Sequence, residues 1–191
     1  MIQELLVVVG ASLQIGQVAP FLVAMARGSA KPNIVSWCTW TVLTGIGSAA
    51  AFISGDRQAG VIVGANGLGT AAVVVLGFWR GYAKLTRFDV LCQVGALLGF
   101  ATWPLLQGPL LAVIIVVVID AVAAVATLYH AYRRPYEEVW LTYTLAGLGA
   151  LCGLFALNEF TIVSSLYLFY LVVADMLISA VILVRRRMAA L

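Results

Sequence analysis

The chain has 191 residues, of which 63% are hydrophobic and only 10% are charged, and its mean hydropathy is +1.07. A soluble domain of this size is roughly half apolar and about a quarter charged, so this composition excludes an ordinary soluble fold and predicts that most side chains face lipid. The formal net charge of +3 comes from loop arginines and does not indicate nucleic-acid binding.

Seven apolar runs are long enough to cross a bilayer as helices. About 20 residues rising about 1.5 Å each span roughly 30 Å of hydrocarbon. The runs cover residues 3–26, 34–54, 60–79, 88–106, 109–130, 138–157 and 161–184. Helices are favoured because backbone groups in lipid must bond internally. We therefore predict an all-α membrane protein with seven transmembrane helices and short loops. No basic region precedes the first run, so we expect that helix to be retained rather than cleaved as a signal peptide.

Basic residues gather in alternate loops and in the tail. One side carries Arg27, Lys31, Arg80, Lys84, Arg87, Arg133, Arg134, Arg185, Arg186 and Arg187, and the other carries only Arg57. Positively charged loops stay cytoplasmic, so this asymmetry predicts an N-terminus outside and a C-terminus inside.

The chain also contains an internal repeat. Pro32, Trp37, Thr39, Trp40 and Thr41 recur in the same order as Pro135, Trp140, Thr142, Tyr143 and Thr144, so the two prolines lie 103 residues apart. At a longer offset, Asn66 and Thr70 align with Asp175 and Ser179. Each pair places a polar residue and a hydroxyl one turn apart on the same helix face. A repeated pattern of this kind predicts one structural unit used twice.

We therefore predict a bundle of three helices in residues 1–80, a linker helix in 81–107 and a second bundle in 108–191. A single connecting helix makes the two bundles run parallel, related by an axis along the membrane normal.

This 3+1+3 arrangement resembles the SWEET sugar transporters and the wider PQ-loop (MtN3-like) family. The residues that carry the resemblance are Pro20 before a basic loop, the tryptophan-bearing second helix, and the run Val61-Ile62-Val63-Gly64-Ala65-Asn66-Gly67 with Gly69. The chain departs from the family at Phe21, Ala123 and Asp175, where the family has glutamine, proline and asparagine. The family's pocket tryptophan aligns near Ala51. The resemblance implies a bacterial inner-membrane protein whose Asn66 lines a substrate pocket.

Two acids lie within apolar helices and are the leading candidates for function. A carboxylate at that depth costs about 2.5–3.5 kcal/mol on insertion scales, so Asp120 and Asp175 should face the interior of the bundle. Both are candidates for proton coupling, because burial favours the protonated form of a carboxyl. Predicted substrate contacts are Asn66, Asp175, Thr70, Ser179, Gln17 and Tyr170. Pro20 removes one backbone hydrogen bond from the first helix and is a candidate hinge.

Structural explanations compete with several of these functional ones. Asp120 and the glutamines Gln14 and Gln17 could simply bond neighbouring helices, and the kink at Pro20 could be static. Trp37 and Trp140 are expected to anchor the cytoplasmic interface, and His130 to be a solvated interface histidine. Cys38, Cys92 and Cys152 are expected to be packing residues.

The sequence favours an alternating-access carrier of a small polar solute such as a sugar, an amino acid or a vitamin. Coupling to protons and uniport both stay open, as does a homo-oligomeric state. The alternative is a receptor or assembly subunit of the same architecture that transports nothing. No nucleotide loop, His/Glu metal cluster or nucleophile–base pair occurs in the sequence, so we expect no enzyme activity, no metal and no cofactor. Beyond the solute, the expected partner is the lipid bilayer.

Overall fold

The computed structural model describes residues 2–53, 57–82, 86–102, 109–157 and 159–190, and within them it is helical without a strand. The helices are α1 (Ile2–Gly16), α2 (Val18–Ala26), α3 (Ile34–Ile53), α4 (Arg57–Trp79), α5 (Arg87–Thr102), α6 (Pro109–Arg133), α7 (Trp140–Phe155) and α8 (Ile162–Ala189). Gln17 alone separates α1 from α2, so the described part has seven helices when these two count as one. The all-α prediction is confirmed.

The helices coincide with the predicted apolar runs to within a few residues, and the largest difference is at the end of α8. The last run was expected to end at 184, but α8 continues to Ala189. Arg185 donates to the Tyr132 carbonyl at 3.1 Å, and Arg186 donates to the carbonyls of Pro135 and Glu138 at 3.0 and 2.6 Å. Cations at a helix C-terminus also complement its dipole, so these basic residues extend the helix instead of ending it.

Three helices are long and apolar enough to cross a membrane: Ile2–Ala26, Leu110–Arg133 and Ile162–Ala189. The segments Ile34–Ala49, Val63–Trp79 and Trp140–Phe155 are apolar but shorter within the described residues. Large apolar side chains lie exposed on the outer faces, for example Leu68, Leu98 and Phe169. Such surfaces need an apolar solvent or partner, which is compatible with a membrane protein.

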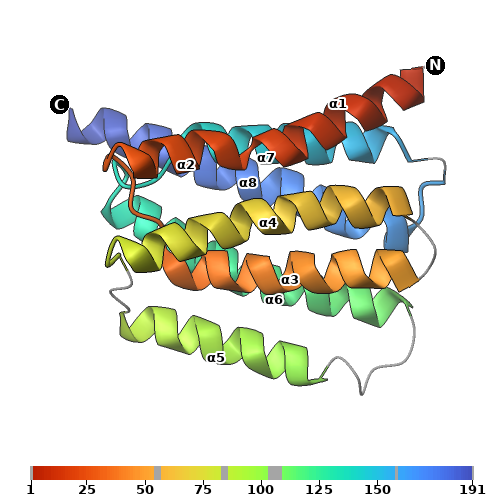
Figure 1. The fold of residues 1–191 in the computed structure, drawn as a ribbon, viewed down its shortest axis with the longest axis horizontal. Coiled ribbons are helices and arrows are strands. Elements are labelled where there is room, and N and C mark those ends of the chain that lie inside the picture. Colours follow the sequence, from red (N-terminus) through yellow and green to blue (C-terminus); the bar gives the residue numbers. More distant parts are fainter. Residues whose placement is uncertain (1, 54–56, 83–85, 103–108, 158, 191) are drawn as a thin grey trace.

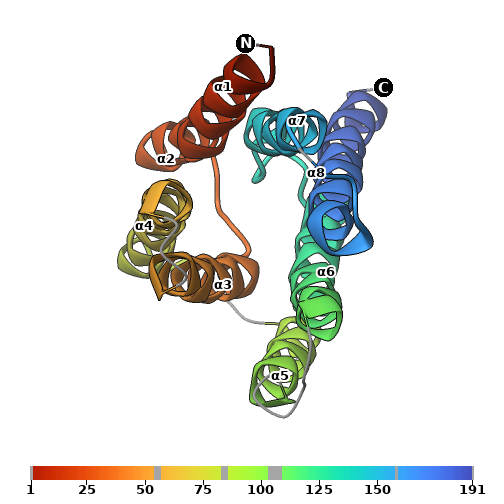
Figure 2. The same cartoon turned by 90° about the vertical axis from the view of Figure 1, so that its right-hand side faces the viewer.

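The helices lie side by side along one long axis (Figure 1). Viewed end-on, α1 with α2, α4 and α3 lie on one side and α7, α8 and α6 on the other, while α5 packs outside against α6 and α3 (Figure 2). Between the two sides, α1 packs on α7 and α3 packs on α6. The basic segments at 27–33 and 131–137 lie at the same end as the C-terminus, and the N-terminus lies at the opposite end (Figure 1). Lys84 and the linker boundary at 107/108 fall outside the described residues.

The main hydrophobic core lies between the two sides, towards the basic end. Phe21, Met25, Val73 and Ile182 are fully buried there. Trp37 belongs to the same core and is only 2% exposed, so its predicted role as an interface anchor is wrong. Its ring lies 4.9 Å from that of Phe21.

Candidate functional site

A cavity of about 90 Å³ lies where the two sides of the molecule meet. Every helix except α5 contributes to its wall among the described residues. Five residues predicted from the sequence line it: Gln17, Asn66, Thr70, Asp120 and Asp175. The wall also includes Gln14, Trp37, Trp40, Thr142, Tyr143 and Tyr167. We call this space the central cavity.

Asp120 is held by donors from two other helices. Its carboxyl accepts from Trp40 Nε1 at 3.0 Å, from the Tyr167 hydroxyl at 2.8 Å and from the Tyr170 hydroxyl at 3.2 Å. The rings of Tyr167 and Tyr170 stack with their centroids 6.2 Å apart. Asp120 is 4% exposed, so these three bonds supply most of the polar environment that its carboxyl has lost from water.

Asp175 is placed differently, although it lines the same cavity. Its Cβ lies against the backbone of α7, 3.3 Å from the position that a Cβ on Gly147 would take. Within the described part of the chain, no hydrogen bond or ion pair reaches its carboxyl, and no lysine, arginine or histidine lines the cavity. The cavity therefore holds one acid that is fully bonded and one that has no partner.

Amide side chains line the opposite wall. Gln17 donates to Gln14 Oε1 at 2.9 Å and to Asn66 Oδ1 at 3.3 Å, and Gln14 donates to the Ala146 carbonyl at 3.1 Å. These bonds join α1, α4 and α7 across the cavity. Gln17 is also the residue at which the first helix is interrupted. Pro20 explains the interruption, because it lacks the N–H that would bond the Gly16 carbonyl.

Two predicted contact residues lie behind the cavity rather than in its wall. Ser179 is 4% exposed and shares a hydrogen bond of 2.7 Å with Thr144, joining α7 to α8. Tyr170 donates its hydroxyl to Asp120, which does line the cavity. Thr70 reaches the wall but is also bonded, since it accepts from Thr41 at 3.1 Å and joins α3 to α4. The two hydroxyl pairs occupy equivalent positions in the sequence repeat.

Two polar groups at the cavity are buried without a partner. Trp37 Nε1 and Thr142 Oγ1 make no hydrogen bond within the described structure, and each residue is 2% exposed. An unpaired polar group of this kind costs about 1–3 kcal/mol. The sequence could not reveal these groups, because whether a donor is paired depends on packing.

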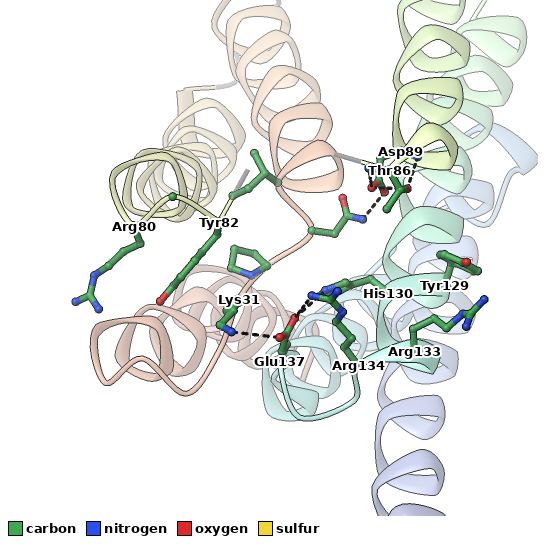
Figure 3. Close-up of a pocket in the computed structure, with 14 residues that line it drawn as sticks. Lys31, Arg80, Tyr82, Thr86, Asp89, Tyr129, His130, Arg133, Arg134 and Glu137 are labelled. Atoms are coloured by element: carbon green, nitrogen blue, oxygen red, sulfur yellow. Dashed lines mark hydrogen bonds and ion pairs between the residues drawn. The ribbon is translucent and has the colours of Figure 1, made fainter. Parts of the chain in front are cut away.

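A second and larger space, the basic-end cleft, has a volume of about 740 Å³ (Figure 3). Glu137 lies on its wall and pairs with Lys31 at 3.4 Å, with Arg134 at 3.4 Å and with His130 Nε2 at 3.3 Å. Asp89 accepts from Asn33 at 2.7 Å on the same wall. Most of the charges that face this cleft are thus already paired (Figure 3).

A buried glutamate connects the cleft to the central cavity. Glu138 is 0% exposed and lies 2.7 Å from His130 Nδ1, while the Tyr143 hydroxyl donates to its other oxygen at 2.7 Å. His130 lines the cleft and Tyr143 lines the cavity. His130 faces the cleft as the sequence predicted, but its side chain is only 18% exposed, because the short loop after α6 brings Glu137 and Glu138 onto its ring. Sequence reasoning missed Glu138, because an acid beside a basic loop is typical of a solvated surface.

Comparisons with known proteins leave the function to be inferred from this site. No family model matches the chain, and neither the curated proteins nor the solved structures contain a significant match to it.

Proposed function

We propose that this protein is an alternating-access membrane carrier of a small polar solute. In this proposal, residues 1–80 and 108–191 form two parallel three-helix bundles, and α5 within 81–107 is the linker. The N-terminus is outside and the basic end is cytoplasmic. The observation that carries the proposal is the central cavity, which lies between the two halves and has polar residues from both in its wall.

The contacts between helices support a two-fold relation between the halves. The second and third helices pack together in each half, as α3 on α4 and as α7 on α8. Between the halves, α1 packs on α7 and α6 packs on α3, which is the reciprocal pattern that a two-fold axis generates. The hydroxyl pairs Thr41–Thr70 and Thr144–Ser179 repeat the same contact within each half.

Direct bonds tie the halves together at the basic end. The backbone N–H of Lys31 donates to the Glu137 carbonyl at 2.8 Å, in addition to the ion pair between their side chains. Deeper in, Ser36 donates to the Ala123 carbonyl at 2.7 Å. A carrier needs such ties to break and re-form as its halves rock. The Lys31–Glu137 ion pair is partly exposed, so breaking it costs little.

The first experiment is a ligand screen by thermal unfolding of the purified protein. A solute at 100 times its Kd raises the free energy of unfolding by about 2.7 kcal/mol, which separates binders from non-binders. The panel contains sugars, amino acids, vitamins and small amines. Asn66→Ala and Asp175→Ala should lose the stabilisation, whereas Glu159→Gln, an exposed site away from the cavity, should keep it.

The second experiment tests for alternating access. Spin labels at Arg27 and Arg134 report on the basic end, and labels at Phe52 and Leu110 report on the opposite end. A pair within one half, at Val42 and Val75, is the control. A ligand found in the screen should change the first two distances in opposite directions and leave the control unchanged. A ligand that stabilises the protein without moving either pair would favour the non-transporting receptor.

A further inference from the structure

We propose that the solute is a small organic cation, a short-chain amine that also carries an oxygen acceptor, and that it exchanges with a proton at Asp175. This inference rests on the carrier function proposed above and names the substrate class of the same cavity.

The size of the central cavity limits the solute. Pockets that hold drug-sized ligands have volumes of about 300–1,000 Å³, so the central cavity, at about 90 Å³, is small. A solute of a few non-hydrogen atoms fits this space, whereas a hexose would require the cavity to widen first. The cavity in this conformation is therefore matched to a molecule much smaller than a sugar.

The acids on the cavity wall favour a cation as the solute. Asp120 already accepts three hydrogen bonds, so it orients α3 and α8 and has little acceptor capacity left. Asp175 has no partner among the described residues, and the other titratable groups on the wall are Asp120, Tyr143 and Tyr167, none of which is a cation. When Asp175 is ionised in this cavity, a positive charge beside it compensates its own, which a neutral solute cannot do.

Aromatic rings around the acids favour an organic cation over a bare metal ion. Trp37 and Trp40 lie with their ring centroids 5.4 Å apart, and Trp40 and Tyr143 lie 6.4 Å apart. All three residues line the cavity. Ring faces attract ammonium groups, and the attraction strengthens when water is excluded. No group of three or more metal-ligating acids, histidines or cysteines occurs in the described structure.

The two unpaired polar groups indicate the second feature of the solute. The Trp37 Nε1–H is a buried donor without an acceptor, and the Thr142 hydroxyl is unpaired as well. A hydroxyl or carbonyl oxygen on the solute would accept from Trp37 while its ammonium contacts Asp175. The solute class is thus an amine with an oxygen a few bonds away.

The cation and a proton exchange because both bind to the same group, the carboxyl of Asp175. When the cation is bound, the Asp175 carboxyl is ionised, and when the cation leaves, a proton binds to the same carboxyl in its place. One positive charge therefore crosses in each direction per cycle. The exchange carries no net charge and should not respond to the membrane potential.

Three small probes test the solute class by thermal unfolding of the purified protein. Ethanolamine carries both the charge and the oxygen, propylamine lacks the oxygen, and ethylene glycol lacks the charge. Ethanolamine should bind most tightly, and Asp175→Asn should weaken it by about tenfold or more, since hydrogen bonds to charged groups are the stronger class. Glu159→Gln is the matched control and should bind as the wild type does.

The variant Trp37→Phe tests the second contact, because it removes the indole N–H but keeps an aromatic ring. It should reduce the preference for ethanolamine over propylamine by about fivefold to tenfold. Both affinities are measured on the same variant, so a general loss of stability does not affect the ratio. An unchanged ratio would overturn the assignment of Trp37.

Transport into proteoliposomes tests the exchange. A pH gradient should drive labelled ethanolamine uptake, and a potential imposed with potassium and valinomycin should leave the rate unchanged. Uptake that follows the potential would overturn the exchange. If ethylene glycol or glucose binds as well as ethanolamine does and Asp175→Asn has no effect, the proposed solute class is wrong, but the proposed carrier function is not contradicted. If no solute in either panel binds and neither end moves, the carrier function itself fails.

Discussion

At the scale of single residues, the two acids within the apolar helices, Asp120 and Asp175, differ in what surrounds them. Both were predicted to face the interior and to be candidates for carrying a proton, and both line the central cavity. Only Asp120 has hydrogen-bond donors around it, because Trp40 and the tyrosines of α8 converge on it. A fully bonded carboxyl is a positioning group, whereas a carboxyl without partners is free to bind a proton or a ligand.

This difference predicts opposite costs of substitution. Asp120→Ala leaves three buried donors unpaired and should lower the free energy of unfolding by about 3 kcal/mol or more. Asp175→Ala removes an acid that has no partner in the described structure and should leave stability unchanged or raise it. Unfolding of the two purified variants in the same detergent measures both values. Equal losses of stability would mean that Asp175 is as firmly bonded as Asp120.

Within the network that connects the cleft to the cavity, Glu138→Ala should be strongly destabilising. It would remove the acceptor of the Tyr143 hydroxyl and the partner of His130 together. The expected loss is about 3–5 kcal/mol, the typical cost of breaking a buried charged pair by removing one partner. Glu137→Ala removes only partly exposed pairs and should cost about 1 kcal/mol or less, which makes it the neighbouring control.

At the scale of helices, α1 and α7 pack closely where the two halves meet. A Cβ added at Gly10 would lie 3.1 Å from the Gly149 carbonyl oxygen and 3.1 Å from Cys152 Cβ, so the backbone of α7 would have to move to admit it. Small residues at such crossings let helix backbones pack closely in membranes. Gly149 and Gly153 have the spacing that permits close helix contact, but a chain with 18 glycines contains many similar spacings, so spacing alone does not single out this one.

Gly10→Ala should therefore push α1 away from α7 and lower the free energy of unfolding by about 1–3 kcal/mol. Gly16→Ala is the matched control on the same helix, because nothing lies within 4 Å of the Cβ it would add. That variant should be neutral or slightly stabilising, since alanine favours the helix more than glycine does. Thermal unfolding of the two variants measures both effects on stability. Equal effects would contradict the close contact between α1 and α7.

At the scale of the whole molecule, the basic residues define one end, and the proposed membrane orientation rests on that end. A cysteine at Gly108 should react with an impermeant reagent from outside, although Gly108 lies outside the described residues. The cytoplasmic reporter is better placed at Ser29 than at Gly28, because Gly28 has a φ of 73°, which strains any other residue. Ser29→Cys should react only after permeabilisation, in a background without the three native cysteines. The reverse pattern would invert the topology.

The sequence by itself determined that the fold is all-α, where the helices lie along the chain and which end of the molecule carries the basic residues. The apolar runs are long enough to span a bilayer, and the loops between them are short. In lipid the backbone groups of such runs must bond internally, which leaves few alternatives to helices. Repeat spacing also indicated Asn66 and Asp175 as residues on a shared interior face, and both line the cavity. These predictions succeeded because they depend on composition and periodicity, which are local properties of the chain.

Only the tertiary structure decided which polar groups are paired. Asp120 and Asp175 look alike in sequence, and Glu138 looks like a surface acid. Their environments are set by residues from other helices, such as Trp40 and Tyr167 for Asp120 and His130 and Tyr143 for Glu138. Hydrogen bonding and burial depend on distances of a few ångströms between segments far apart in the chain, and no local pattern encodes those distances.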